Sequence, residues 1–309
     1  MKVSILIPTH NRAALLRRTL DSVSRQRIPP GTECECVVVA NACTDDTESV
    51  VAELGAAFPM PLRCTAEPRP GLGAARNRAV REAAGDVLAL IDDDVDLDQG
   101  WLEALASGAA AGGADLFAGR ITLWWEAVLR PAWLTPGMEM LLSCLDRGPE
   151  PIDLARPDVI GANFAFTRHA YECCGPFRED IDRIGSALLG GGETYFARAA
   201  QRRGMRIRYL PGMFVRHWVA PHRVEPPYLC AVSMGNAISI LLMKQRYTLL
   251  DAARTVLIGL VRIATHALLL PFALLAGRPG AAMNSRVRIA IGRGQLLGAW
   301  RRFTSGPLR

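Results

Sequence analysis

The chain has 309 residues, of which 50% are hydrophobic and 21% charged, and its formal net charge is +6. Its length accommodates one large α/β domain with an appendage, and its apolar content allows a sizeable core. The eight cysteines form no CxxC pair and no Cys/His spacing of a zinc site, which excludes a zinc-binding module. The sequence opens on a strand pattern rather than a signal peptide, so we expect reduced thiols in a cytosolic compartment.

The charge is distributed unevenly along the chain. Asp251 is the last acidic residue, and residues 252–309 carry nine arginines and no lysine, so this tail has a charge of +9 and the remainder a charge of −3. Basic charge confined to one end predicts an anionic partner, either a lipid surface or a nucleic acid.

Apolar runs and helical patterns alternate in the first 91 residues. Pro8 is expected to stop the first strand, because proline lacks an N–H group, and Asn11 to cap the helix that follows. Thr44 or Asp45 is expected to cap the second helix. The expected strands are 3–8, 35–40, 62–66 and 87–91, and the expected helices are 12–26, one that ends near 54, and 74–84. This alternation predicts a parallel sheet with right-handed crossovers.

Three consecutive carboxylates, Asp92, Asp93 and Asp94, follow the last of these strands. A buried strand cannot continue through three charges, so the acids lie where it emerges, at the edge where α/β sheets bind ligands. Like charges at that edge repel one another unless a cation is present, and Mg²⁺ and Mn²⁺ prefer carboxylate and phosphate oxygens. By themselves these residues leave two interpretations open: a metal–phosphate site, or an acidic loop that caps the next helix together with Asp98.

The alternation continues from residue 101 to residue 217 around an irregular insertion. Residues 124–157, which contain three tryptophans and several prolines, form either a flexible loop that faces an acceptor or a packing lobe. Gly161 indicates a close backbone approach, and Glu193 follows three glycines at a helix start, where a carboxylate is also an ordinary cap. The expected helices are 101–111 and 194–203, and the expected strands are 115–121, 159–167, 206–210 and 213–217.

Residues from 226 onward have a helical pattern, with apolar helices expected at 228–244 and 256–276. The second of these is long enough to span a bilayer, but Arg262 near its middle makes spanning costly. Three placements remain open: an interfacial helix whose arginines, Arg262 included, face lipid headgroups, a spanning helix, or a helix packed within a soluble domain.

Taken together, these segments resemble the family 2 glycosyltransferases, whose GT-A fold is a Rossmann-like α/β fold with a mostly parallel sheet and helices on both faces. The resemblance covers roughly residues 3–225 and rests on the order and spacing of its pieces. Those pieces are residues 4–12, the acid-containing turn 38–47, the glycine–arginine–asparagine segment 71–77, a DxD motif at 92–94, Trp101-Leu102, the glycine strand 161–166, Gly192-Glu193 and His217.

The resemblance implies four groups of site residues. Asp92, Asp94 and His217 would hold Mn²⁺ or Mg²⁺, which neutralises a diphosphate leaving group, and Glu193 would be the catalytic base. The residues expected on the acceptor side are Gly161, Asn163, Trp124 and Trp125. The residues expected to bind the nucleotide-sugar donor are Pro8, Thr9, His10, Asn11, Arg12, Asn41, Asp45, Gly71, Arg76, Asp92 and Asp93.

These roles predict an inverting glycosyltransferase that moves a sugar from a nucleoside-diphosphate sugar to a hydroxyl of a glycan or lipid-linked glycan. The GT-A domain would occupy residues 1–225, with the insertion at about 124–157. The basic, apolar helical region 226–309 would attach to an anionic membrane surface on the cytoplasmic side, peripheral to the inner or plasma membrane. We do not expect a nucleic acid partner, because the tail shows no aromatic stacking platform.

Two departures from the family pattern leave an alternative open. Ala40 stands where the family often has an acid that contacts the nucleobase, so Asn41 or Asp45 would have to substitute for it. Around Gly192 the chain offers the single carboxylate of Glu193, where the family usually has an acidic pair. The alternative is a glycan- or lipid-binding protein that keeps the GT-A fold but has lost transfer.

Overall fold

The computed structural model describes residues 1–183 and 188–304, and its contacts divide the chain into two compact units. The first unit consists of Met1–Trp124, Ser143–Glu179 and Gly192–Trp218. The second unit consists of Trp125–Leu142, Asp180–Gly191 and Val219–Arg309. The second unit therefore combines the C-terminal helices with the first part of the proline- and tryptophan-containing insertion, while the later part of that insertion belongs to the first unit.

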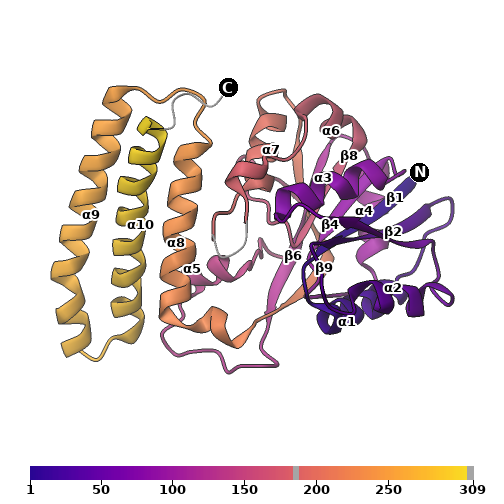
Figure 1. Cartoon of the computed structure of the whole chain (residues 1–309), viewed down its shortest axis with the longest axis horizontal. Helices are drawn as coiled ribbons and strands as arrows, with labels where there is room; N and C mark the ends of the chain where they lie inside the picture. The colour runs from indigo at the N-terminus through magenta and orange to yellow at the C-terminus, as the bar shows by residue number, and fades with distance from the viewer. Residues whose placement is uncertain (184–187, 305–309) are drawn as a thin grey trace. The chain divides into compact units, whose positions relative to one another are not determined.

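The described residues of the first unit contain a mixed sheet in the order β3-β2-β1-β4-β8-β6-β9-β5, with β7 paired to β9 (Figure 1). β1 to β4 pair in parallel, as predicted, whereas β8 lies antiparallel to both β4 and β6. The strands are β1 (Lys2–Thr9), β2 (Glu33–Asn41), β3 (Leu62–Glu67), β4 (Val87–Ile91), β5 (Val95–Leu97), β6 (Leu116–Trp124), β7 (Ile152–Asp153), β8 (Asn163–Thr167) and β9 (Ile207–Trp218).

Pro8 lies inside β1, so the prediction that it ends the strand is wrong. The strand continues to Thr9, and Pro8 pairs with Val39 of β2. On its other side, β1 pairs with β4 only as far as Leu6 opposite Leu90. At Pro8 the strand therefore has a paired neighbour on one side alone, a position at which a strand tolerates proline.

Asn11 does not cap α1 (Ala13–Ser24), contrary to the prediction. Asn11 has a φ of 52°, and its side-chain oxygen accepts a hydrogen bond from the N–H of Thr44 at 2.7 Å. The N–H of Ala13 donates instead to Asp45 Oδ2 at 2.9 Å. Asp45 Oδ1 accepts from the N–H of Thr47, the first residue of α2 (Thr47–Gly55), at 3.2 Å. One carboxylate therefore serves two helix N-termini, where negative charge is favoured.

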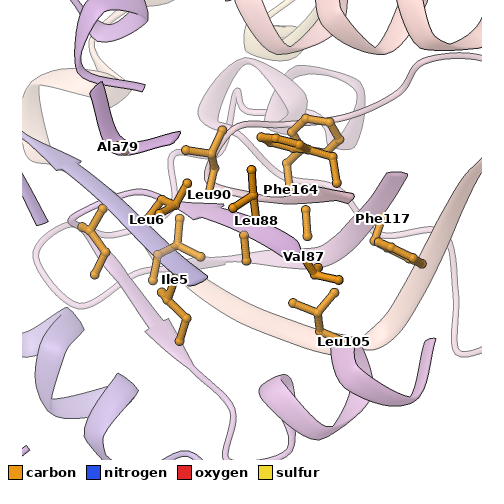
Figure 2. Close-up of a cluster of buried hydrophobic side chains, with 14 of the residues drawn as sticks. Ile5, Leu6, Ala79, Val87, Leu88, Leu90, Leu105, Phe117 and Phe164 are labelled. Carbon is orange, nitrogen blue, oxygen red and sulfur yellow. The ribbon is translucent and has the colours of Figure 1, made fainter. Parts of the chain in front are cut away.

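Helices cover both faces of the sheet. Figure 1 shows α3 (Leu72–Glu82), α6 (Arg168–Cys174) and α7 (Gly192–Gln201) over one face, and α1 and α2 over the other. Figure 2 shows Ala79 of α3 and Leu105 of α4 (Trp101–Ala110) on opposite sides of β1 and β4. Every residue of β4 is buried, which is why its sequence is a continuous apolar run instead of an alternating pattern.

Aromatic rings anchor α7 against the sheet. The ring of Phe196 on α7 lies 4.9 Å from that of Phe166 on β8 and 5.0 Å from that of Phe177, measured between centroids. Both contacts are within the range that favours aromatic pairs. The start of α7, which carries Glu193, is therefore held by buried packing one turn away.

Two later strands differ from the predictions in their bounds. The sequence predicts separate strands around Pro211-Gly212, but β9 runs unbroken, and its register against β6 shifts between Gly119 and Arg120. This bulge accommodates the extra residues without ending the strand. The strand expected from residue 159 begins only at Asn163, because a turn closed by the N–H of Asn163 and the carbonyl of Ile160 precedes it.

The second unit contains a layer of three long helices, in which α10 lies between α8 and α9 (Figure 1). Glycines bring the helices close: a Cβ atom on Gly292 of α10 would lie 2.8 Å from the carbonyl oxygen of Gly259 on α9. The helices of this unit are α5 (Pro136–Glu139), α8 (Pro226–Leu242), α9 (Leu249–Leu275) and α10 (Pro279–Thr304). The described residues also form short 3₁₀ turns at η1 (Met140–Leu142), η2 (Glu179–Ile181) and η3 (Pro221–Val224).

Among the described residues, α9 is the one helix long and apolar enough to cross a membrane. Two of its polar side chains contact α10: Arg262 Nη1 donates to Gln295 Oε1 at 2.6 Å, and His266 Nδ1 lies 3.4 Å from Ser285 Oγ. Arg262 is half-buried against the neighbouring helix, and the placement of α9 at a membrane stays a prediction. The large apolar side chains that α9 leaves exposed are leucines, with Ile258, Val261 and Phe272, and Arg254 and Thr265 are exposed as well.

Candidate active site

The three acids after β4 lie between two strands. Asp93 and Asp94 are buried, Asp92 is half-buried, and β5 follows them directly. β5 separates the acids from α4, and Asp98, the last carboxylate before that helix, accepts a hydrogen bond from Gly100 N at 3.0 Å. This placement favours a site at the sheet edge over a helix cap.

His217 meets these acids from β9. It pairs with Val95 in the antiparallel ladder, and the N–H of Trp218 donates to the Asp94 carbonyl oxygen at 2.9 Å. His217 is 1% exposed, and its Nε2 lies 3.1 Å from Asp94 Oδ1. Asp92, Asp94 and His217 each offer one ligand atom, and these atoms lie within 4.8 Å of one another. Two carboxylates and an imidazole form a donor set that suits a divalent cation such as Mn²⁺ or Mg²⁺.

The middle acid, Asp93, points to the end of β1. Its Oδ2 accepts a hydrogen bond from Thr9 Oγ1 at 2.6 Å, and its Oδ1 accepts from Arg12 Nη1 at 3.0 Å. The same Nη1 donates to Asp94 Oδ2 at 2.8 Å. Burial and the neighbouring charge of Asp94 raise the pKa of Asp93 to about 6, against the opposing effects of Arg12 and Thr9. Arg12 thus partly balances the repulsion within the acid cluster.

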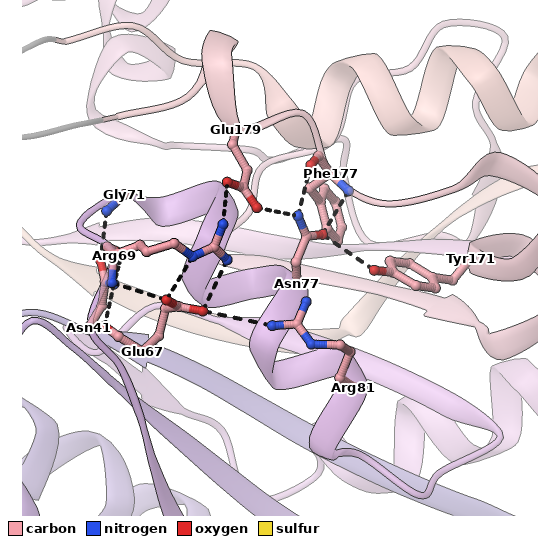
Figure 3. Close-up of polar contacts among 9 residues, drawn as sticks. All are labelled: Asn41, Glu67, Arg69, Gly71, Asn77, Arg81, Tyr171, Phe177 and Glu179. Atoms are coloured by element: carbon pink, nitrogen blue, oxygen red, sulfur yellow. Dashed lines mark hydrogen bonds and ion pairs between the residues drawn. The ribbon is translucent and has the colours of Figure 1, made fainter.

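Asn41, at the end of β2, organises the loop that leads into α3 (Figure 3). Its Nδ2 donates to the carbonyls of Glu67 at 3.0 Å and Arg69 at 2.7 Å, while its Oδ1 accepts from Gly71 N at 2.9 Å. The Nδ1 of His10 lies 2.6 Å from the carbonyl oxygen of Asn41. The structure thus brings His10, Asn41 and Gly71, all expected donor-binding residues, to one corner of the sheet edge.

Glu67 is a buried acid of this corner that the sequence analysis did not single out. It is 4% exposed, and its carboxylate accepts from the backbone N–H and the guanidinium of Arg69 at 3.0–3.2 Å (Figure 3). Hydrogen bonds from Arg69 hold the pKa of Glu67 below its ordinary value, with burial opposing. An acid at the end of a strand was the signal available, since Glu67 is the last residue of β3 and Asp92 directly follows β4.

Asn77 on α3 fixes the opposite side of the same corner. Its Nδ2 donates to the Phe177 carbonyl at 2.9 Å, and its Oδ1 accepts from Phe177 N at 2.8 Å and from Tyr171 Oη at 3.3 Å (Figure 3). Arg69 Nη1 reaches Glu179 Oε2 of the same loop at 3.2 Å. These contacts join residues about 100 positions apart, so no local pattern could have predicted them.

Glu193 stands at the start of α7 and is paired with Arg76. Its Oε2 accepts a hydrogen bond from Arg76 Nη1 at 3.0 Å, and its Oε1 lies 3.4 Å from the donating N–H of Gly161. Burial raises the pKa of Glu193, but the Arg76 charge and the backbone amides outweigh it, so the pKa lies below its ordinary value. The carboxylate is therefore ionised at neutral pH and is able to accept a proton.

The residues expected on the acceptor side do not share one location. Asn163 is completely buried: its Oδ1 accepts from Trp101 Nε1 at 2.8 Å, and its Nδ2 donates to two carbonyls of β6 and β9. Trp124 pairs with Trp218, next to His217, and so lies on the opposite face of the sheet from the histidine. The Trp124 ring lies against two guanidinium groups, and Trp125 belongs to the second unit.

The site as a whole lies at the carboxyl ends of β1, β2, β3 and β4, the edge at which open α/β sheets bind ligands. β1 supplies Pro8 and Thr9, and the loop after it supplies His10 and Arg12. β9, which pairs antiparallel with β5, brings His217 to the acids, and α7 brings Glu193 to α3. Asp45, in contrast, is engaged with both of its oxygens at helix N-termini.

Comparison with known proteins places this arrangement in a family. Residues 4–175, more than half of the chain, match the family described as Glycosyl transferase family 2. Glycosyltransferase AglE of Haloferax volcanii is 30% identical over 225 residues, which cover 71% of this chain and 67% of that protein. The glucosyl-dolichyl phosphate glucuronosyltransferase of the same organism is 26% identical over 253 residues, covering 80% and 79%.

Solved structures share the fold. The mannosyltransferase PcManGT from Pyrobaculum calidifontis, in complex with GDP-Man and Mn²⁺, has a TM-score of 0.65 at 20% identity and covers 97% of this chain and 87% of that chain. S. aureus TarS 1–349 in complex with UDP-GlcNAc has a TM-score of 0.52 at 18% identity and covers 83% and 70%. The α/β sheet with helices on both faces is thus the GT-A fold, and this chain belongs to the family 2 glycosyltransferases.

Proposed function

We propose that this family 2 glycosyltransferase is an inverting enzyme that moves a sugar from a nucleoside-diphosphate sugar to a hydroxyl of a glycan or lipid-linked glycan. The observation that carries the proposal is the buried Asp94–His217 contact beside Asp92, at the same sheet edge as an ionised Glu193. The acid–histidine cluster is suited to hold a cation against a charged leaving group, and Glu193 is suited to accept a proton.

Asp92, Asp94 and His217 would hold the divalent cation, Mn²⁺ or Mg²⁺. When bound, that cation supplies positive charge against the diphosphate as it leaves. The buried carboxylates favour such a cation, because like charges in a desolvated place are costly without compensation. The Mn²⁺ in the structure of PcManGT supports this assignment.

The donor would lie along the ends of β1 and β2. Thr9 and Arg12 hold Asp93, and Asn41 holds the loop that ends at Gly71. Pro8, His10, Asn11, Asp45 and Asp92 would also contact the donor, whereas Arg76, which the resemblance places among them, pairs with Glu193. The GDP-Man and UDP-GlcNAc in two related structures support a nucleotide-sugar donor.

Glu193 would take the proton from the acceptor hydroxyl. The acceptor oxygen then bonds to the anomeric carbon from the face opposite the diphosphate, and the sugar–phosphate bond breaks, so the anomeric configuration inverts. Gly161, whose N–H faces Glu193, lies on this acceptor side. The name of the glucuronosyltransferase relative, which acts on glucosyl-dolichyl phosphate, supports a lipid-linked acceptor.

The second unit would attach the enzyme to an anionic membrane surface, peripherally and on the cytoplasmic side. Arg262 and His266 of α9 contact α10, while the helix exposes large apolar side chains: Leu268 and Phe272 are each 69% exposed. A helix packed into a soluble core would show the reverse pattern. The arginines of the tail, with no acid after Asp251, favour anionic lipid.

The test is a transfer assay with a panel of UDP- and GDP-sugars, Mn²⁺ and a glucosyl-phosphodolichol acceptor, in which nucleoside diphosphate release and the product anomer are measured. We expect one donor to be turned over with inversion, and Glu193→Gln to lower turnover by about 10²–10⁴-fold. Glu103→Gln, an exposed glutamate in the first turn of α4, is the control and should be silent. Full turnover by Glu193→Gln, or retention at the anomeric carbon, would refute the proposal.

A further inference from the structure

Arg76 is a buried arginine whose charge is directed at the proposed base. Its side chain is 3% exposed, and it reaches Glu193 from the inner face of α3, with 3.0 Å between Nη1 and Oε2. Burying a guanidinium is costly, so such a residue is normally paired with the group it stabilises. The sequence resemblance places Arg76 among the donor-binding residues, but its guanidinium forms an ion pair with Glu193, 117 positions away.

Gly161 shows that the position of this guanidinium is built into the fold. A Cβ atom on Gly161 would lie 2.0 Å from Arg76 Nη2 and 2.9 Å from its Cζ. A side chain at this position would therefore clash with the guanidinium, and glycine leaves room for it. The Gly161 N–H also faces Glu193 Oε1. Each oxygen of the carboxylate is therefore contacted by a different segment, one by α3 and one by the turn before β8.

We propose that Arg76 is a positioning residue for Glu193, which fixes the orientation and charge of that carboxylate and acts on the reaction through it rather than by contacting the donor. The inference rests on the proposed role of Glu193 as base. It explains why α3 carries a buried arginine here, and why Gly161 has no side chain.

The electrostatics of Glu193 give this inference a pH signature. Apart from burial, the largest effects on its carboxylate among residues 1–183 and 188–304 come from Arg76 on α3, the Gly161 N–H in the turn before β8, and its own N–H on α7. Burial raises the pKa of Glu193, and these three groups lower it. Loss of Arg76 leaves burial less opposed, so the pKa of Glu193 must rise and the carboxylate must protonate at a higher pH.

The experiment compares Arg76→Met, Arg76→Lys and Gly161→Ala with the parent enzyme. We expect Arg76→Met to lower kcat at pH 7 by about 10–100-fold, a part of what a general base contributes. The acid limb of the pH–rate profile should move to higher pH, while KM for the donor stays unchanged. Arg76→Lys should recover part of the loss, and Gly161→Ala, which displaces the guanidinium but keeps both charges, should shift the profile in the same direction.

Arg78→Met is the matched control, because Arg78 lies two positions along α3 and pairs with Glu82 at the surface. In a Glu193→Gln background, Arg76→Met should add no further loss, since residues that act as one unit are not additive. A raised donor KM with an unshifted pH profile would overturn the inference, because Arg76 would then bind the donor. An additional loss in the double variant would overturn it as well.

Carbon-13 NMR of labelled glutamate carboxyls separates this inference from the proposed function. The Glu193 signal is identified by its absence in Glu193→Gln, and its pKa should rise in Arg76→Met and Gly161→Ala but not in Arg78→Met. An unchanged pKa would refute the coupling even if transfer were impaired. Full turnover by Glu193→Gln would instead refute the role of Glu193 as base, whatever the titration shows.

Discussion

Single side chains in this protein divide into those that face the ligand edge and those that hold that edge in shape. Asp92, Asp94 and His217 belong to the first group by geometry, since their ligand atoms converge. The side-chain oxygens of Asp93 and Asn41 accept hydrogen bonds from Thr9 and Gly71, so these two residues mainly position other groups. A substitution in the second group should therefore disturb stability and site geometry together.

The buried amide of Asn163 is predicted to stabilise the fold. Asn163→Ala removes the acceptor for Trp101 Nε1 and the donors for the carbonyls of Arg120 and Met213, at a position with no exposed surface. Leaving buried polar groups without partners should lower the free energy of unfolding by about 2–4 kcal/mol. Urea denaturation measures this loss. The control is Ser24→Ala, at a half-buried serine of α1 whose side-chain hydrogen bond is exposed, and its effect is expected within about 0.5 kcal/mol. A loss as small as that of the control would mean that the amide is not structural.

Secondary-structure elements were predictable where one physical cause dominates. β1, β2 and β4 are buried on both faces, and their continuous apolar runs predict them directly. β5 has three residues and β7 has two, too few for any periodicity to register. Pro8 and the pair Pro211-Gly212 gave wrong strand ends, because tolerance of proline depends on which neighbouring strand is paired at that position, and this is a property of the sheet.

The exposed apolar face of α9 predicts that this helix contributes to membrane binding. Replacing Leu268 and Phe272 together by Asp places two charges on this face. Binding to anionic vesicles of phosphatidylglycerol and phosphatidylcholine should then fall at least tenfold, which is a loss of about 1.4 kcal/mol or more in binding free energy. Vesicle flotation of the full-length protein measures this binding. Leu129→Asp, at an 89% exposed leucine outside the helix, should leave flotation unchanged. Equal flotation of the double variant would assign membrane contact elsewhere, and absence of flotation in the parent would remove the membrane proposal.

At the scale of the whole molecule, the site is assembled from segments that the sequence keeps far apart. The resemblance named Asp94, His217, Arg76 and Glu193 because each lies in a recognisable piece of the family pattern. It did not predict that Arg76 pairs with Glu193, or that Asn163 is completely buried. Such contacts join residues more than 60 positions apart through sheet order and helix packing, so a local sequence pattern cannot predict them.

The most direct test of the central claim is calorimetric titration of GDP and UDP, each with Mn²⁺, into the parent protein, Asp94→Asn and Glu193→Gln. If the acid–histidine cluster holds the leaving group while Glu193 handles only the proton, the parent binds one of the two nucleotides and EDTA abolishes that binding. Asp94→Asn should weaken it at least tenfold, a loss of about 1.4 kcal/mol or more. Glu193→Gln should bind as the parent does. Binding that is indifferent to EDTA and equally strong in Asp94→Asn would contradict the claim.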